Sequence, residues 1–213
     1  MTSDSQSSPR RSRRDEYAEL TRTAVVDAAR TLFAERGYFA TTINEIADRG
    51  RVSSGTVYQQ CGGKQGLLRT LMDMWTTSPL VAETLSSIRR ASTLEESLEL
   101  LTEAYLGMHS QFDDIIQTVS TTAAQDGSAA AALAVALARH RAALLEIAAT
   151  VRPLGGFPVA FSDDDFADLA LFYYGAHGGF HFLIAVLGWP AERARRWLHK
   201  QFVHSLLDAT ASA

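Results

Sequence analysis

Residues 62–66 read Gly-Gly-Lys-Gln-Gly, and a glycine-rich turn that carries a lysine can bind phosphate. The turn lies in the segment VSSGTVYQQCGGKQGLL, residues 52–68. A nucleotide-binding P-loop would need a glycine five residues before Gly63 and a hydroxyl residue directly after Lys64. Those two positions hold Tyr58 and Gln65 instead. The spacing therefore argues against a nucleotide site and leaves the phosphate of a nucleic-acid backbone as the ligand to consider.

The residues around this turn predict a set of helices that would position it. A helix is expected over residues 15–36, with Gly37 as its stop. Thr42 and Glu45 have the spacing of a capping box and begin a short helix that ends at Arg49. A second short helix is expected from Ser53 or Ser54 to Gln60. A longer helix follows over residues 64–88, where Pro79 bends or breaks it.

The second short helix has little to bury apart from Val57 and is otherwise rich in hydroxyl and amide side chains. A helix of this kind is a poor structural element and a good candidate for insertion into a DNA groove. Glutamine pairs with adenine through two hydrogen bonds, and threonine contacts bases or phosphates. Lys64 then begins the next helix, where the backbone amides also favour phosphate. Two short helices after a long one are the arrangement of a helix-turn-helix DNA-binding domain.

The segment AARTLFAERGYFATTINEIADRGRVSSGTVYQQCGGKQGLL resembles the DNA-binding domain of the tetracycline-repressor (TetR) family of bacterial regulators. The matching positions are Leu32, Phe33, Gly37, Tyr38, Thr42, Ile46, Ala47, Val52, Ser53, Gly55, Thr56, Tyr58, Lys64 and Leu67. The resemblance covers about 45 residues. Beyond them, only the length and the helical character of the chain fit the family.

The resemblance implies roles for individual residues. The candidates for DNA binding are Thr42, Arg51, Ser53, Ser54, Thr56, Tyr58, Gln59 and Lys64. Thr42, Tyr58 and Lys64 would bind backbone phosphate, while Ser54, Thr56 and Gln59 would lie nearest the base edges.

Two positions depart from the family pattern. Arg51 replaces the turn glycine, so it either adopts a left-handed conformation or itself reaches DNA. Cys61 replaces an aromatic residue and is interpreted as a small buried hydrophobic side chain, with a redox switch as the less favoured alternative.

Composition and charge limit the possible partners. Hydrophobic residues make up 46% of the 213 residues, enough for a core. Residues 1–14 are polar and basic and are interpreted as a disordered arm whose arginines, Arg10 to Arg14, contact DNA. Residues 1–70 carry 11 Lys/Arg and 8 Asp/Glu, against 9 and 16 in residues 71–213, which favours an anionic partner for the first part only. No run of 18 apolar residues occurs, so the sequence predicts no membrane span and a cytoplasmic protein.

The C-terminal two thirds are expected to be helical as well. Capping signals at Thr93 and Ser162, and Gly188 before Pro190, divide this region into helices that include residues 128–151 and 163–187. His177 and His181 are four residues apart and could hold a metal, but no further ligand is near, so neither a metal nor a cofactor is predicted. An enzyme that uses His177 with Asp168 is the remote alternative, and since no nucleophile motif supports it the prediction is no enzyme.

The family resemblance also implies a cavity for a small effector in the middle helices and a homodimer through the last two. Candidate effector-binding residues are Trp75, Tyr105, Met108, His109, Phe112, His140, Phe172, Tyr173 and His177. Candidate dimerisation residues are Gly175, Gly179, Phe180, Ile184, Trp197, Phe202 and Leu206.

These inferences combine into an all-α protein with a basic arm at residues 1–14, a helix-turn-helix domain at residues 15–62 and an effector-binding and dimerisation domain at residues 63–213. The predicted function is a regulator, most simply a repressor, that binds a palindromic double-stranded DNA operator and is released by a mostly apolar or aromatic effector. The alternative is a helix-turn-helix DNA-binding protein without an effector.

Overall fold

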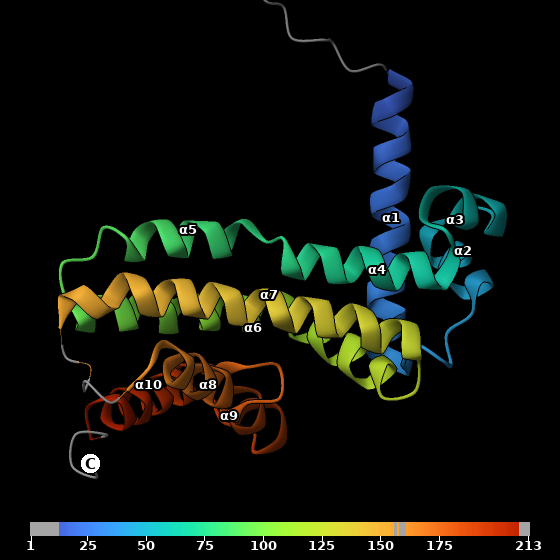
Figure 1. Cartoon of the computed structure of the whole chain (residues 1–213). Coiled ribbons are helices and arrows are strands. Elements are labelled where there is room, and N and C mark those ends of the chain that lie inside the picture. Colours follow the sequence, from blue (N-terminus) through green and yellow to red (C-terminus); the bar gives the residue numbers. More distant parts are fainter. Residues whose placement is uncertain (1–12, 156, 158–160, 209–213) are drawn as a thin grey trace, which may run out of the picture. The chain divides into compact units, whose positions relative to one another are not determined.

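The structure is a computed structural model that describes residues 13–155, 157 and 161–208. Its α-helices are α1 (Arg13–Arg36), α2 (Ile43–Gly50), α3 (Ser54–Cys61), α4 (Gly63–Thr76), α5 (Pro79–Ile88), α6 (Leu94–Ala123), α7 (Gly127–Val151), α8 (Asp163–Tyr174), α9 (Gly179–His181) and α10 (Ala191–Asp208) (Figure 1). A 3₁₀ turn, η1 (Arg152–Leu154), follows α7, and a π-helical turn, η2 (Phe182–Val186), follows α9. The described residues contain no strand, and the all-α prediction is confirmed.

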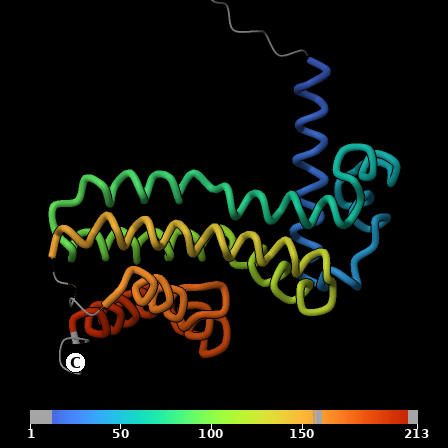
Figure 2. The backbone as a smooth tube through the Cα atoms, viewed as in Figure 1, coloured from blue at the N-terminus to red at the C-terminus, as the bar shows by residue number. Residues whose placement is uncertain are grey.

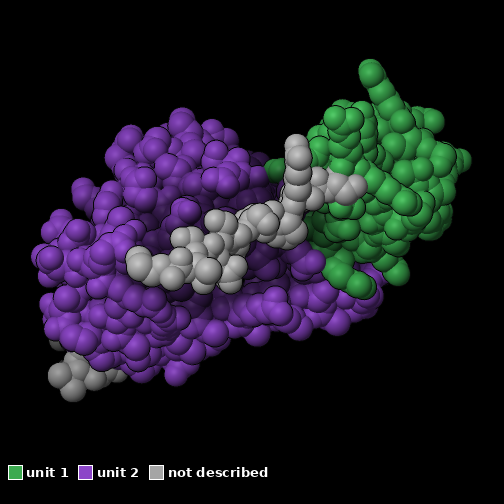
Figure 3. All heavy atoms as spheres, turned by 90° about the horizontal axis from the view of Figure 1, so that it is seen from above, with its two compact units in different colours: residues 1–71 green, residues 72–213 purple. Residues whose placement is uncertain are grey.

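The chain forms two compact units, residues 1–71 and residues 72–213 (Figure 3). Sequence analysis placed the boundary after residue 62, whereas the division falls inside α4. The first two turns of α4 belong to the N-terminal unit because Leu67, Leu68 and Leu71 are all buried.

In the N-terminal unit, α1, α2 and α3 pack against one another around one small core. Val25, Ala29 and Phe33 of α1 are buried there, together with Ile46 of α2 and Val57 of α3. The N-terminal part of α1 has no buried residue before Val25. Of the predicted basic arm, Arg13 and Arg14 are the first residues of this helix rather than part of a disordered segment, and residues 1–12 lie outside the described residues.

Three glycines shape the turn from α3 to α4. Gly62 and Gly63 both have left-handed backbone angles, with φ of +71° and +73°. Gly66 lies so close to the end of α3 that a Cβ atom there would sit 1.7 Å from the carbonyl oxygen of Cys61. The glycine-rich stretch therefore serves a tight reversal of the backbone between two helices.

The C-terminal unit is built on the pairing of α6 and α7, which lie side by side (Figure 2). α5 packs on α6, α8 packs on α7, and α10 packs on both α6 and α8. The predicted helix over residues 64–88 is divided as anticipated at Pro79: α4 ends at Thr76, and α5 begins anew with Ser78 as its N-cap.

The predicted continuous helix over residues 163–187 was wrong. α8 ends at Tyr174, and Gly175 and Gly178 bring the backbone back against the last carbonyl groups of α8. A Cβ atom would lie 2.5 Å from the carbonyl oxygen of Leu171 at Gly175 and 2.8 Å from that of Phe172 at Gly178. These glycines thus interrupt the helix, and a new short helical segment starts at Gly179.

Two segments, residues 127–154 and 163–186, are long and apolar enough to cross a membrane by length and composition. This is weak evidence for a span. The first segment includes α7, which packs between α6 and α8, and the second is interrupted at Gly175.

The approach at Gly66 generates a first prediction. Gly66→Ala should destabilise the protein by about 3 kcal/mol or more, or prevent folding of the N-terminal unit, because the added methyl group meets backbone. Gly55→Ala is the matched control, since its Cβ would make only an ordinary contact, 3.6 Å from Ser53 Oγ. Chemical denaturation of both variants tests this, and equal stability of the two would contradict the analysis.

Candidate DNA-binding surface and ligand cavity

The start of α2 is fixed by the capping box that the sequence predicted. The Thr42 hydroxyl accepts a hydrogen bond from the Glu45 backbone amide, and the Glu45 carboxylate accepts one from the Thr42 amide at 2.8 Å. Hydrogen bonds from Thr42 lower the pKa of Glu45, and Arg36 adds an ion pair at 2.6 Å. Thr42 is exposed, so its position at this helix start is compatible with the predicted phosphate contact.

Arg51 takes the left-handed conformation that its replacement of a turn glycine predicted. Its φ is 56°, and its backbone amide returns to the carbonyl groups of Ala47 and Asp48. Such a conformation costs a non-glycine residue on the order of 1 kcal/mol. The Arg51 side chain is exposed beside the start of α3.

Hydroxyl groups anchor the start of α3. Ser53 is the N-cap: its Oγ accepts from the Thr56 amide at 3.1 Å and lies 2.9 Å from Thr56 Oγ1. Ser54 donates to Asn44 Oδ1 of α2 at 2.7 Å. The hydroxyls of Ser54 and Thr56, the two hydroxyl residues predicted to lie nearest the base edges, therefore already have partners within the protein.

The accessible side chains of α3 lie further along the helix. Tyr58 is 60% exposed, and Gln59 is also exposed. The Tyr58 ring packs against Gly63, where a Cβ atom would come within 2.9 Å of it. Only Val57 and Cys61 of α3 are buried, so the helix is seated by two small side chains and keeps a polar outer face.

Lys64 lies at the start of α4, as the sequence predicted. Its Nζ is 4.5 Å from the centre of the Tyr38 ring and 3.5 Å from the Phe39 carbonyl oxygen. Burial lowers the pKa of Lys64, although Glu45 opposes this effect. Burial also raises the pKa of the Cys61 thiol, which agrees with the interpretation of Cys61 as a small core residue.

One positioning residue was not anticipated. Arg22 of α1 donates to the Gln60 carbonyl oxygen, at the end of α3, and to the Thr70 hydroxyl of α4. It satisfies a carbonyl group that the helix end leaves free. No local motif marks this contact, because the two residues are 38 positions apart.

The C-terminal unit contains a cavity of about 240 Å³ that is partly open to solvent. Of the residues predicted to bind an effector, those that line it are Trp75, Tyr105, Met108, His109 and His140. Lining residues outside that prediction include Asp113, Arg139, Tyr174, Phe180 and His181. The walls are mainly apolar and aromatic, which is typical of small-molecule sites.

The other predicted effector residues do not line the cavity. Phe112 is buried elsewhere on α6, Phe172 is 69% exposed, and Tyr173 hydrogen-bonds to Ser205 of α10 at 2.9 Å. His177 is exposed in the break between α8 and α9. The break accounts for His177, because residues after Tyr174 no longer follow the helical spacing on which the prediction rested; Phe172 and Tyr173 lie within α8 but do not line the cavity.

The polar groups of the cavity form two clusters. Tyr105 and His140 share a hydrogen bond of 2.7 Å across α6 and α7. His109 and His181 both contact Asp113 Oδ1, at 3.1 and 3.3 Å. The Gln117 amide also lies 2.9 Å from His181 Nδ1.

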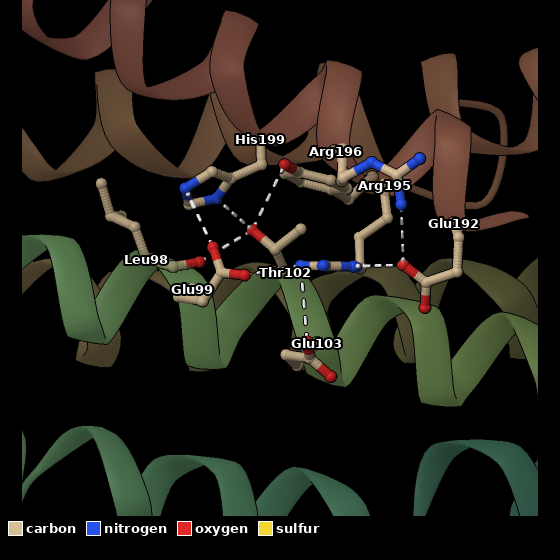
Figure 4. Close-up of polar contacts among 9 residues, drawn as sticks. Leu98, Glu99, Thr102, Glu103, Glu192, Arg195, Arg196 and His199 are labelled. Atoms are coloured by element: carbon tan, nitrogen blue, oxygen red, sulfur yellow. Dashed lines mark hydrogen bonds and ion pairs between the residues drawn. The ribbon is translucent and has the colours of Figure 1, made fainter.

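A polar cluster between α6 and α10 supports one cavity wall (Figure 4). The Arg195 side chain is only 13% exposed and pairs with Glu99 at 2.6 Å and with Glu192 at 3.1 Å. His199 contacts Glu99 and the buried Thr102, each at 3.0 Å. Thr102 Oγ1 also lies 3.5 Å from the hydroxyl of Tyr174, whose ring stacks on Tyr105 at 4.7 Å.

The geometry gives no support to an enzyme that uses His177 with Asp168. Asp168 is paired with Arg141 of α7, while His177 is exposed. Within the described part of the chain, no group of three or more His, Cys, Asp or Glu residues could hold a metal ion.

The environment of His140 generates a prediction for stability against pH. Burial lowers its pKa to about 4, whereas a histidine in an unfolded chain titrates near 6.5. The neutral imidazole therefore contributes stability that is present above pH ~6.5 and is lost as the pH falls towards 4. His140→Gln should reduce this loss by on the order of 2 kcal/mol.

Urea unfolding at several pH values between 4 and 7 measures the effect, with His204→Gln of α10 as the control for an exposed histidine. A pH dependence in His140→Gln that equals that of the parent would rule out this role for His140.

The family model described as bacterial regulatory proteins, tetR family, matches residues 25–71. The HTH-type transcriptional regulator HbdR of Aromatoleum sp. (strain CIB) is 44% identical over 50 residues, which are 24% of this chain and 22% of HbdR. The HTH-type transcriptional repressor KstR2 of Rhodococcus jostii (strain RHA1) is 41% identical over 51 residues, 24% of this chain and 25% of KstR2. The matched segment thus spans about a quarter of the length of these curated relatives.

Similarity to solved structures extends over most of the chain. A protein of Mesorhizobium loti described as a TetR-family transcriptional regulator has a TM-score of 0.73 at 14% identity, covering 93% of this chain and 98% of its own. A Saccharomonospora viridis protein solved in complex with choline has a TM-score of 0.69 at 21% identity, covering 88% and 98%. Residues 25–71 thus match the TetR-family model, and most of the chain shares the fold of solved structures that are described as TetR-family regulators.

Proposed function

We propose that this protein is a ligand-responsive repressor that binds a palindromic operator as a homodimer and releases it when a small effector binds. The observation that carries the proposal is α3, an exposed polar helix that is capped at its start and seated by only two buried side chains. A helix of this kind contributes little to folding, so its polar face is available for the major groove. A regulator of this type acts in the bacterial cytoplasm, where the DNA is.

The exposed side chains suggest a division of roles at the DNA. Gln59 is the candidate for direct base recognition, because a glutamine can pair with adenine through two hydrogen bonds. Arg51, Tyr58 and Lys64 are the candidates for phosphate contacts, which set position and not sequence preference. Ser53, Ser54 and Thr56 are proposed to act mainly by holding α3 in place, since their hydroxyls are already engaged.

This division predicts two different binding phenotypes. Lys64→Ala should weaken binding to all duplexes alike and lower the slope of log affinity against log salt by about one unit. Gln59→Ala should instead change the preference among operator variants. Both can be measured by fluorescence anisotropy on a duplex that the parent protein selects from a random pool.

Lys200→Ala on α10 is the control for loss of a positive charge outside the N-terminal unit. Parent-like affinity, salt dependence and sequence preference in both test variants would show that α3 and Lys64 do not face DNA.

A homodimer is supported by apolar side chains that the single chain leaves exposed. They gather on the last helices: Phe172, Phe182, Val186, Leu187, Trp197 and Leu207. Of the predicted interface residues, Trp197 is 45% exposed and Ile184 is half-buried, whereas Phe180, Phe202 and Leu206 are buried within the chain. Exposed apolar surface of this kind is typical of protein–protein interfaces. We therefore place Trp197 and its exposed neighbours at the seam and assign the buried residues to the core.

The predicted seam can be tested with one substitution. Trp197→Glu should convert a dimer into monomers, because a carboxylate buried at the interface without a partner is costly. Light scattering measures the mass of each variant. Val135→Glu is the matched control, since Val135 is an exposed apolar residue of α7. A monomeric parent protein, or a dimeric Trp197→Glu variant, would refute the proposed interface.

Effector control is supported by the cavity in the C-terminal unit. α4 begins at the proposed phosphate contact near Lys64 and ends at Trp75 and Thr76, which line the cavity. An effector acts only if it binds one state of the protein better than the other. A coupling of about 1–3 kcal/mol through α4 would change DNA affinity roughly 5- to 150-fold, with the same factor on effector affinity. The alternative of a DNA-binding protein without an effector leaves the cavity without a role.

A further inference from the structure

One carboxylate of the cavity has an oxygen atom that no described residue contacts through a hydrogen bond or an ion pair. Asp113 of α6 lines the cavity, and its side chain is 32% exposed. His109 and His181 approach it from two helices, and both contact the same oxygen, Oδ1. Among the described residues, none forms a hydrogen bond or an ion pair with Oδ2. Asp113 therefore offers an open acceptor to a ligand.

Asp113 carries its negative charge at neutral pH. Burial opposes ionisation, but hydrogen bonds and charge attraction from His109 and His181 outweigh burial and lower the pKa of Asp113. A hydrogen bond to an ionised acceptor is about twice as strong as one between neutral groups. The open oxygen thus favours a ligand group that donates hydrogen bonds, and a protonated amine is a strong donor of this kind.

The remaining walls of the cavity suit an apolar or aromatic body. Phe180 packs edge-on against His109 at 5.1 Å, which places an aromatic ring next to the carboxylate cluster. Leu101, Leu144 and Ile147 provide apolar surface, and Leu101 lies about 18 Å from Asp113 along α6. A cavity of about 150 Å³ holds benzene, so about 240 Å³ has room for one ring with a short side chain.

Arg139 is the one arginine of the cavity lining and would favour the opposite ligand charge. It is exposed to solvent, whereas Asp113 is about two-thirds buried. Water and salt screen an exposed charge more strongly than a buried one. A ligand inside the cavity therefore experiences Asp113 more strongly than Arg139, and an anion would be repelled where the cavity is least screened.

We propose that the cavity selects a protonated primary or secondary amine on a small apolar body, with the ammonium group donating a hydrogen bond to Asp113 Oδ2. This inference rests on the proposed function of the cavity as the effector site. It names the class of effector, which neither the family resemblance nor the matched proteins specify for this chain.

Three probes of nearly equal size separate charge from shape: 2-phenylethylamine is a cation at pH 7, 2-phenylethanol is neutral, and phenylacetate is an anion. We expect the full-length protein, titrated by calorimetry, to bind the amine at least about tenfold more tightly than either of the others. Asp113→Asn keeps the shape of the side chain and should abolish this preference, while leaving the affinity for 2-phenylethanol within about threefold. Asp114→Asn, the control, removes the same charge from the neighbouring residue, which does not line the cavity, and should retain the preference.

The possible failures are distinct. If 2-phenylethanol or phenylacetate binds the parent protein as tightly as the amine, or if Asp113→Asn keeps the preference, the inference about charge is refuted while the cavity stays a ligand site. If none of the three probes binds, both the inference and the proposed effector site are refuted.

Discussion

The crossing of α3 and α4 at Gly66 is the constraint on which the proposed DNA-binding surface depends. α3 contributes only Val57 and Cys61 to the core, so burial of its own side chains holds it weakly. Its orientation comes from neighbours at both ends: Ser53 and the Ser54–Asn44 hydrogen bond at the start, and Arg22 and the approach of Gly66 at the finish. The polar face of α3 is thus available for recognition because other elements keep the helix folded.

In the C-terminal unit, polar side chains inside the core help to fix the position of one helix against another. Thr102 is fully buried, yet it contacts His199 of α10 and lies near the hydroxyl of Tyr174. A polar contact in a packed interior favours one register of two helices over others, because a slip would leave the groups without partners. Tyr174 lines the cavity and Trp197 is exposed on α10. The proposed ligand site and the proposed dimer surface therefore both depend on this packing of α6 against α10.

Much of this architecture could be predicted from the sequence, for identifiable reasons. The helices of the N-terminal unit begin at Thr42 and Ser53 as predicted, because capping is local chemistry that adjacent residues determine. The left-handed Arg51 followed in the same way from its place in a turn.

What could not be predicted depends on contacts between distant residues. The contact between Arg22 and Gln60 and the joining of His109 and His181 at Asp113 connect separate helices, so no spacing along the chain reveals them. The placement of His177 outside the cavity followed from the break after Tyr174. Gly175 was predicted as a dimerisation residue, whereas Gly175 and Gly178 turn the chain back on α8 itself, and Gly179 lies next to Leu198 of α10.

The break at Gly175–Gly178 separates two tasks that one continuous helix would have combined. Most of α8, including Phe166, Ala167 and Ala170, packs in the core, and only its last residue, Tyr174, lines the cavity. The short segment after the break contributes His181 to the cavity and Phe180 to both. Because this segment is not in helical register with α8, a substitution that reshapes the cavity wall need not disturb the packing of α8 against α7 and α10. A substitution at His181 can therefore reshape the proposed effector site at little cost in foldability, and the divided helix makes that site readily evolvable.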